Sequence, residues 1–141
     1  MNQAAVVISG IALVVSLCSL YRSVRNDRRD ITLRLHESLI DPALQAGRKV
    51  LHEMQDVENL TPEQYELANR ALAALDIAGF YCMKRYVNEK DFLDLWAPAL
   101  VTLKRSAAPF LAHRDAQRPK PVWPHYRRLV EHAEEHLRAD E

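Results

Sequence analysis

Two histidines near the C-terminus have a spacing that zinc ligands often show. The segment HAEEH, from His132 to His136, matches the H-x-x-E-H pattern of inverted zinc peptidases. On a helix this spacing places both imidazoles on one face, where they could bind one metal ion. A catalytic zinc also needs a third protein ligand, and Asp140 and Glu141 are the only carboxylates that follow. We therefore interpret the segment as the end of a charged helix and expect no metal or cofactor.

Asn69 and Asp76 form a second candidate pair. They lie seven residues apart in the apolar segment NRALAALDIAGFYCM, so two helical turns place them on one face. A carboxylate among apolar neighbours is costly unless it has a partner. We predict a buried polar pair that is hydrogen-bonded to a neighbouring helix or to an arginine. The alternative is that Asp76 is an acid that contacts a ligand.

Other signals for catalysis are weak. Cys82 would need a nearby histidine to act as a nucleophile, and a buried free cysteine is the commoner case. The sequence contains neither G-x-G-x-x-G nor G-K-[ST], the glycine-rich motifs that bind phosphate. The other cysteine, Cys18, lies in a different setting, so we expect no disulfide, and this cysteine usage fits a reducing compartment.

The charge of the chain is unevenly distributed. The 141 residues have a formal net charge of zero, but four arginines are clustered at Arg22, Arg25, Arg28 and Arg29. From Asp30 onward, 15 Lys and Arg stand against 18 Asp and Glu. A slightly acidic domain has no basic face for nucleic acid, so we expect no nucleic-acid partner. A local basic cluster is more typical of a segment beside a membrane.

The residues before that cluster predict a membrane anchor. Ala4 to Tyr21 is a run of 18 residues without a charge, and a spanning helix needs about 20 mostly apolar residues, with roughly 17–25 observed. No basic residue precedes the run, as a secretory signal would require. Leu17 before Cys18 is too bulky for a lipoprotein signal. The arginines that follow predict a single-pass inner-membrane protein with the N-terminus outside and the C-terminal domain in the cytoplasm.

The anchor also carries a face of small residues. They recur at spacings of four, three, four and three, which keeps one face of a helix aligned on a partner. Small side chains let two membrane helices approach closely. We therefore predict that the anchor self-associates into a homo-oligomer through Ala5, Ser9, Ala12, Ser16 and Ser19.

The remaining sequence predicts an all-α fold. There are three glycines in the chain, and no segment alternates apolar and polar residues as a half-buried strand does. We expect the anchor helix to continue to about Ile40, followed by helices near 42–57, 62–86, 89–113 and 124–138. Pro98 and Pro109 should bend or divide the helix near 89–113. We divide the chain into an anchor with its basic juxtamembrane segment (1–29) and a bundle of about four to five helices (30–141) with a proline-rich linker (114–124).

Several segments resemble a family of small bacterial membrane-anchored helical proteins of unknown function. They are DPALQAGRKVLHEM, NRALAALDIAGFYCMKRYVNEKDFLDLW and HYRRLVEHAEEHL, and the resemblance extends from about Ile31 to Leu137. In that family an asparagine and an acid lie seven residues apart on the central helix, as Asn69 and Asp76 do, although the acid is more often Glu. The resemblance implies the fold and the topology, and it implies no reaction.

Together these observations predict a membrane-tethered cytoplasmic module for interaction or regulation, without catalysis of its own. Its expected partners are membrane lipid, through the anchor, and an unidentified protein. Two alternatives remain open from the sequence. One is an enzyme that uses Asp76 or the His132 and His136 pair. The other is a small oligomeric membrane effector subunit.

Overall fold

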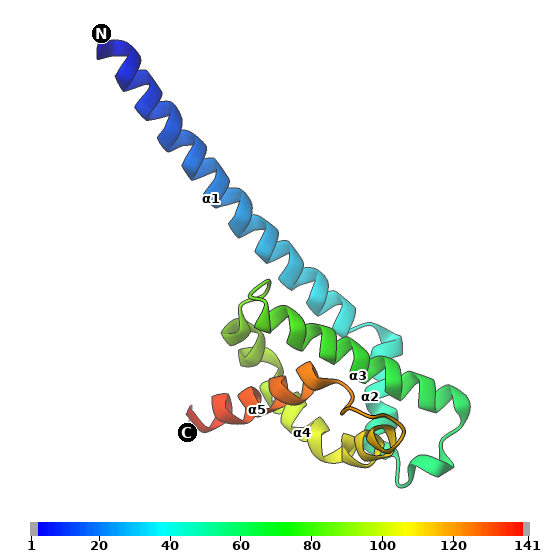
Figure 1. Cartoon of the computed structure of the whole chain (residues 1–141). Coiled ribbons are helices and arrows are strands. Elements are labelled where there is room, and N and C mark those ends of the chain that lie inside the picture. Colours follow the sequence, from blue (N-terminus) through cyan, green and yellow to red (C-terminus); the bar gives the residue numbers. More distant parts are fainter. Residues whose placement is uncertain (1–2, 140–141) are drawn as a thin grey trace.

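The computed structural model describes residues 3–139, with side chains from residue 11 to residue 139. The elements are α1 (Gln3–Leu39), α2 (Pro42–Glu53), the short 3-10 helix η1 (Val57–Asn59), α3 (Pro62–Met83), α4 (Glu89–Ala116) and α5 (Pro124–Ala139). The described residues contain no strand, which confirms the all-α prediction and the helical bundle. Figure 1 shows that α1 is long and projects from a bundle formed by the other helices.

The C-terminal end of α1 is part of the bundle. The helix is uninterrupted, as expected for a segment without proline or glycine between Ile11 and Asp41. Its side chains Leu35 and Leu39 are buried in the core. Arg48 of α2 donates a hydrogen bond from Nη1 to the carbonyl oxygen of Leu39 at 2.7 Å. This bond satisfies one of the carbonyl groups that every helix leaves unpaired at its C-terminal end.

The N-terminal part of α1 carries the segment expected to span a membrane. Within residues 3–139, no helix was found that is both long and apolar enough to be a membrane span. The side chains of residues 3–10, which include Ala5 and Ser9 of the small-residue face, lie outside the described residues. Ala12, Ser16 and Ser19 are exposed on α1. The span and its association face therefore stay predictions.

The bundle is built around α3, the most apolar of the predicted bundle helices. This helix packs against both α2 and α5, and α4 packs against the same two helices. Helices α2 and α3 lie close together at Gly47, where a Cβ atom would lie 2.1 Å from the carbonyl oxygen of Leu67. Glycine is therefore required at this crossing. The largest fully buried side chains of the core are aromatic: Tyr126, Phe92 and Phe110.

Two helix starts agree with their local sequence signals. Thr61 and Gln64 form a capping box at the start of α3, with the Gln64 backbone N–H donating to Thr61 Oγ1 at 3.2 Å and the Thr61 N–H donating to Gln64 Oε1 at 2.9 Å. Asn88 Oδ1 accepts a hydrogen bond from the backbone N–H of Lys90 at 3.0 Å and caps α4. Each cap pairs N–H groups that the first turn of a helix leaves free.

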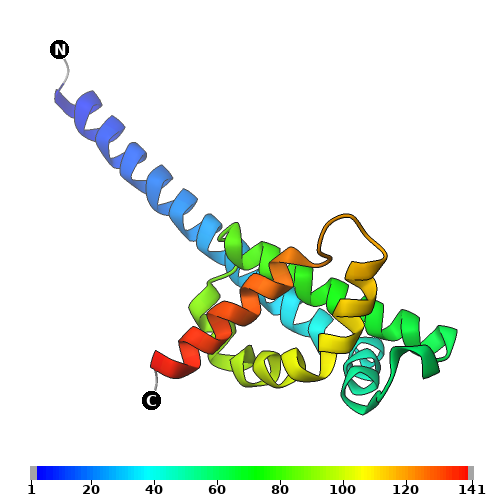
Figure 2. The same ribbon diagram turned by 60° about the horizontal axis from the view of Figure 1, so that its bottom comes forward.

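Helix α4 contains Pro98 and Pro109 and is nevertheless one helix. It follows a curved path along the bundle (Figure 2). A proline inside a helix removes one backbone hydrogen bond and bends the helix where tertiary packing holds both sides in place. Because α4 continues to Ala116, the connection to α5 covers residues 117–123, which is shorter than the expected linker. At the other end of the bundle, α2 stops at Glu53 rather than near residue 57, because Met54 is extended with a ψ of 137°.

Candidate functional site

The side chain of Asp76 binds the N-terminal end of α5. Its side chain is half-buried, and Oδ1 accepts hydrogen bonds from the backbone N–H groups of His125 at 2.8 Å and Tyr126 at 2.9 Å. The residue before Pro124 is Trp123, whose apolar side chain cannot cap the helix and whose φ is 49°. Asp76 therefore caps α5 from a neighbouring helix. A negative charge at this position also interacts favourably with the helix dipole.

Asn69 lies apart from Asp76 and faces a different part of the fold. A separation of seven residues along a helix corresponds to about 10 Å, which is too far for a direct hydrogen bond. Asn69 lines a pocket of about 410 Å³ together with Arg114 and the connection before α5. Asn69 Oδ1 is shielded from solvent without a hydrogen-bond partner among the described residues. The guanidinium of Arg114 lies over the ring of Trp123 at 5.6 Å.

The two histidines of the HAEEH segment point to different carboxylates on α4. His132 Nδ1 contacts Glu89, and His136 Nε2 lies 2.9 Å from Asp94 Oδ1. Over the described part of the chain, no group of three or more His, Cys, Asp and Glu side chains is arranged to hold a metal ion. The spacing that resembles a zinc motif thus joins α5 to α4 through two separate contacts.

Cys82 is buried near the C-terminal end of α3. Burial, and secondarily the charge of Glu89, raise the pKa of the Cys82 thiol to about 12. His52 and His113 make contacts with other residues: His52 Nδ1 is 2.9 Å from Ser106 Oγ, and His113 Nε2 is 2.8 Å from Gln117 Nε2. A thiol with this pKa is almost entirely protonated at neutral pH and is a poor nucleophile.

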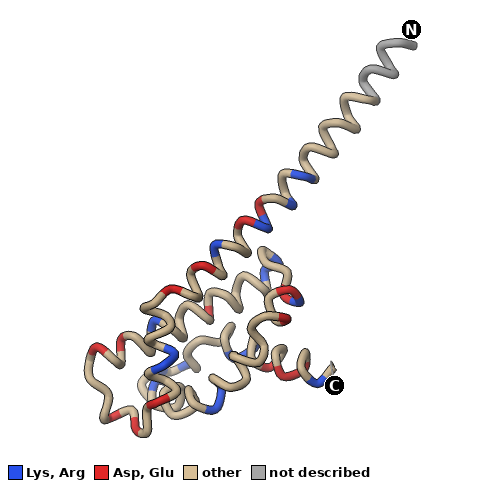
Figure 3. Tube along the Cα trace, turned by 180° about the vertical axis from the view of Figure 1, so that it is seen from behind, with Lys and Arg blue, Asp and Glu red and all other residues tan. Residues whose placement is uncertain are grey.

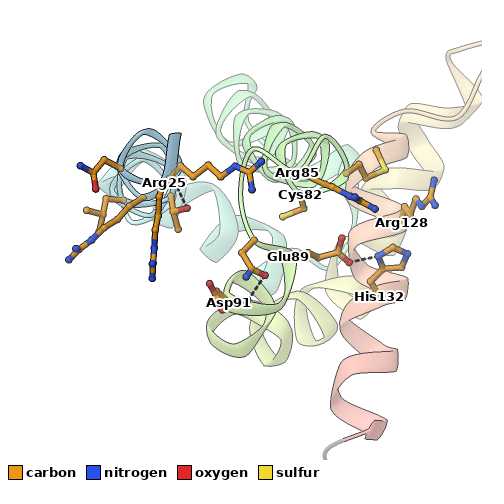
Figure 4. Close-up of a pocket in the computed structure, with 14 residues that line it drawn as sticks. Arg25, Cys82, Arg85, Glu89, Asp91, Arg128 and His132 are labelled. Carbon is orange, nitrogen blue, oxygen red and sulfur yellow. Dashed lines mark hydrogen bonds and ion pairs between the residues drawn. The ribbon is translucent and has the colours of Figure 1, made fainter. Parts of the chain in front are cut away.

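A concave feature lies between α1 and the bundle. We call it the basic cleft: it has a volume of about 1090 Å³ and is lined by α1, the end of α3, the start of α4 and α5. Its lining includes five arginines, namely Arg25, Arg28, Arg29, Arg85 and Arg128. Figure 4 shows Arg25 on one side of the cleft, Arg128 and His132 on the other, and Arg85 and Glu89 between them.

Positive charge dominates the basic cleft. The lining contains five arginines but only two carboxylates, Glu89 and Asp91, and Glu89 already contacts His132. None of the five guanidinium groups makes a hydrogen bond or an ion pair with another side chain in the described part of the chain. Seen from behind in Figure 3, the basic segment of α1 lies on the side of the bundle where α3 ends. The cleft is therefore a concentration of positive charge that no described carboxylate neutralises directly.

Arg85, which lines the cleft, has an unusual backbone conformation. Its φ of 58° lies in the left-handed region. The Arg85 N–H donates to the carbonyl oxygen of Cys82 at 3.0 Å. The Tyr86 N–H donates to the carbonyl oxygen of Tyr81, also at 3.0 Å. This pair of bonds is the Schellman motif that ends many helices, usually with glycine at the left-handed position. A residue with a Cβ costs roughly 1–2 kcal/mol there. The sequence places an arginine at this position despite that cost.

Comparisons of the chain with family models, with curated proteins and with solved structures find no match. The resemblance to the family of small membrane-anchored helical proteins thus stays a prediction.

The sequence revealed only one wall of the cleft. The cluster of Arg25, Arg28 and Arg29 was visible as a local charge pattern, whereas Arg85 and Arg128 are far away along the chain. Nothing in their neighbourhoods distinguishes them from ordinary surface arginines. The left-handed position of Arg85 also carries no local sign, because the glycine that usually marks a helix end is missing.

Proposed function

We propose that the chain is a membrane-tethered helical module, anchored by residues 4–21, whose bundle acts in the cytoplasm by binding a partner protein rather than by catalysis. One observation carries the proposal. Seven large apolar side chains of α1, at positions 11, 13, 14, 15, 17, 20 and 21, are 57–69% exposed. At 100° per residue these positions cover about 220° of the helix circumference. The small uncharged residues Ala12, Ser16 and Ser19 occupy the rest, so no side of this segment carries a charge. A helix that is apolar on every side belongs in a protein core or in a membrane.

The energetics favour a membrane. Fully burying one aliphatic side chain contributes about 1.5–3 kcal/mol. Six of the seven exposed side chains are aliphatic and all retain more than half of their exposure, so moving them into lipid would contribute on the order of 5–10 kcal/mol. The bundle offers no surface to this part of α1, which projects away from it (Figure 1). Lipid is the partner that covers all sides of a single helix.

Carbonate extraction tests the anchor. Membranes from bacterial cells that express the full chain are washed with alkaline carbonate, which removes peripheral proteins. The chain should remain in the membrane pellet. Leu13→Arg with Leu17→Arg should move it to the supernatant, because each arginine near the centre of a span costs roughly 2.5–3.5 kcal/mol.

A matched control places the same change on the bundle. Ile77 and Leu95 are large apolar residues that are 51% and 67% exposed on α3 and α4. Ile77→Arg with Leu95→Arg should leave the chain in the pellet. Release of the wild-type chain by carbonate, or equal behaviour of the two double variants, would overturn the anchor.

The orientation follows from the arginines after the apolar run. Arg22, Arg25, Arg28 and Arg29 flank its C-terminal end, and no basic side chain flanks its N-terminal end. The positive-inside rule then leaves the bundle in the cytoplasm. A C-terminal alkaline phosphatase fusion, which is active only in the periplasm, should stay inactive. Strong activity of the fusion would reverse the orientation.

The side chains that an enzyme would need are engaged in structural contacts. Asp76 binds two backbone N–H groups of α5, and His132 and His136 contact carboxylates of α4. This supports an interaction module over an enzyme that uses these residues.

A further inference from the structure

The basic cleft has the composition of a phosphate site. Five arginines line it without ion-pair partners among the described residues, together with two carboxylates. Arginine binds phosphate oxygens well because its planar fork donates two parallel hydrogen bonds and its charge is weakly hydrated. The excess of positive charge favours a ligand with a net negative charge over a zwitterion.

The position of the cleft relates it to the membrane. In the proposed topology the span ends at Tyr21, and Arg25 and Arg29 follow it on the same helix at four and eight residues. A rise of 1.5 Å per residue places them about 6 Å and 12 Å beyond the apolar run. The polar headgroup region on each side of a bilayer is roughly 5–8 Å thick. The mouth of the cleft therefore lies at the depth of the lipid phosphates and just beneath them.

We propose that the basic cleft binds the phosphate of an anionic phospholipid headgroup, between the arginines of α1 and those of the bundle. The proposal rests on the proposed membrane anchor. A volume of about 1090 Å³ exceeds what one phosphate ion needs, and it accommodates a headgroup together with its glycerol. Leu33 and Met83 add apolar surface to the lining. Glu89 and Asp91 provide acceptors for headgroup hydroxyls, which matches phosphatidylglycerol.

Arg85 and Arg128 are the residues that distinguish this site from an ordinary juxtamembrane cluster. A membrane anchor needs basic residues only on α1, where they set its orientation. Arg85 and Arg128 come from the end of α3 and from α5 and reach the same cleft. The strained backbone of Arg85 is consistent with a side chain that is kept for binding, since strain of this kind is concentrated at functional sites. A phosphate held between the two groups would fix the bundle against the membrane surface.

Spin-labelled lipids provide the test. The full chain is reconstituted into phosphatidylcholine vesicles that contain a trace of chain-labelled phosphatidylglycerol or chain-labelled phosphatidylcholine. The motionally restricted fraction of each label gives the preference of the protein for the anionic lipid. Arg85→Gln with Arg128→Gln should lower this preference about fivefold or more, because one arginine near anionic lipid contributes about 1 kcal/mol.

The matched control removes the same charge outside the cleft. Arg105 on α4 and Arg138 on α5 are exposed and do not line it. Arg105→Gln with Arg138→Gln should keep at least about half of the wild-type preference. Equal losses in the two double variants would mean that net charge alone attracts the lipid, and the cleft proposal would be wrong. Circular dichroism of both variants shows whether the bundle has folded.

Flotation of the same vesicles separates the possible failures. If the chain does not float with vesicles of phosphatidylcholine alone, the anchor is wrong and the cleft proposal falls with it. If the chain floats but binds both labels equally, the anchor stands and the cleft proposal alone is overturned. Inorganic phosphate at about 1 mM should not displace the labelled phosphatidylglycerol from the wild-type chain. Displacement would identify a site for free phosphate instead of lipid.

Discussion

Removing the carboxylate of Asp76 should detach the start of α5 from α3. One oxygen of this side chain accepts hydrogen bonds from the N–H groups of His125 and Tyr126, at 2.8 Å and 2.9 Å. Gly79, one turn later on α3, lies against the same backbone: a Cβ there would be 2.5 Å from the carbonyl oxygen of His125. Asp76 and Gly79 together position the start of α5 on α3. Asp76 contributes the hydrogen bonds, and Gly79 allows the close approach of the backbone.

The expected decrease in the free energy of unfolding follows from the hydrogen bonds and the charge that Asp76→Ala removes. A helix cap contributes about 0.5–2 kcal/mol, and a hydrogen bond to a charged group contributes about 1.5–3 kcal/mol. Because Asp76 is half-buried and accepts two bonds, Asp76→Ala should lower the free energy of unfolding by about 2–3 kcal/mol. Asp76→Asn keeps an acceptor oxygen and loses the charge, so it should cost about 1 kcal/mol, the upper range of an exposed helix-dipole interaction.

Urea unfolding of the full chain in detergent micelles measures these differences. The fluorescence of Trp96 and Trp123 reports on the bundle, and Trp123 directly precedes α5. Amide hydrogen exchange adds a local measurement, since the N–H groups of His125 and Tyr126 should lose protection in Asp76→Ala. Glu66→Ala is the control: Glu66 is an exposed acid on the same helix whose ion pair with Arg70 should contribute less than about 0.5 kcal/mol.

Two results would refute this reasoning. The first is a free energy of unfolding for Asp76→Ala within about 0.5 kcal/mol of wild type, the limit expected for an ordinary surface substitution. The second is unchanged protection of the two amides. If either result were combined with loss of a cellular phenotype, the alternative that Asp76 is an acid that contacts a ligand would be favoured.

Three further predictions concern other parts of the chain. Gly47→Ala should lower the midpoint of thermal unfolding by at least about 5 °C, because the new Cβ meets a backbone carbonyl 2.1 Å away; an unchanged midpoint would mean that α2 and α3 are farther apart. With the other cysteine replaced by serine, Cys82 should react with a water-soluble maleimide at pH 8 at least about 100-fold more slowly in the folded chain than in urea, since burial raises its pKa to about 12. Fast labelling would place the thiol at the surface. Ala12→Leu with Ser16→Leu should reduce crosslinking between copies of the chain in membranes, because larger side chains keep the helices apart. A leucine-to-alanine pair on the opposite face should do much less, and equal crosslinking in all versions would make the anchor a simple tether.

Local sequence signals were sufficient to place several helix starts. The Thr61 and Gln64 pair and the Asn88 cap each depend on residues within one turn, and their spacing determines the hydrogen bonds. The absence of helix breakers between Ile11 and Asp41 likewise predicted that α1 continues into the bundle. These features require no knowledge of what packs against them.

Features that depend on distant residues could not be read in this way. The sequence indicated that Asp76 needs a partner, but the partner is the backbone of residues 49 and 50 positions later. Backbone N–H groups are present at every residue, so no side-chain type marks them. Similarly, the end of α3 lacks the usual glycine, and its left-handed Arg85 is evident only from the φ of 58°.

The continuity of α1 connects the proposed anchor, the cleft and the core. From Tyr21 to Leu35 the helix extends over 14 residues, or about 21 Å, without a proline or glycine that would make it flexible. Three of the five cleft arginines, Arg25, Arg28 and Arg29, lie within this segment. Leu35 at its end and Leu39 beyond it are buried in the core of the bundle. In the proposed topology, the depth of the cleft below the span is therefore set by a rigid helix rather than by a linker. A headgroup that binds Arg85 and Arg128 together with α1 needs the folded bundle, so by mass action it must also stabilise the fold. If the cleft binds lipid as proposed, lipid composition and bundle stability are coupled through the same five arginines.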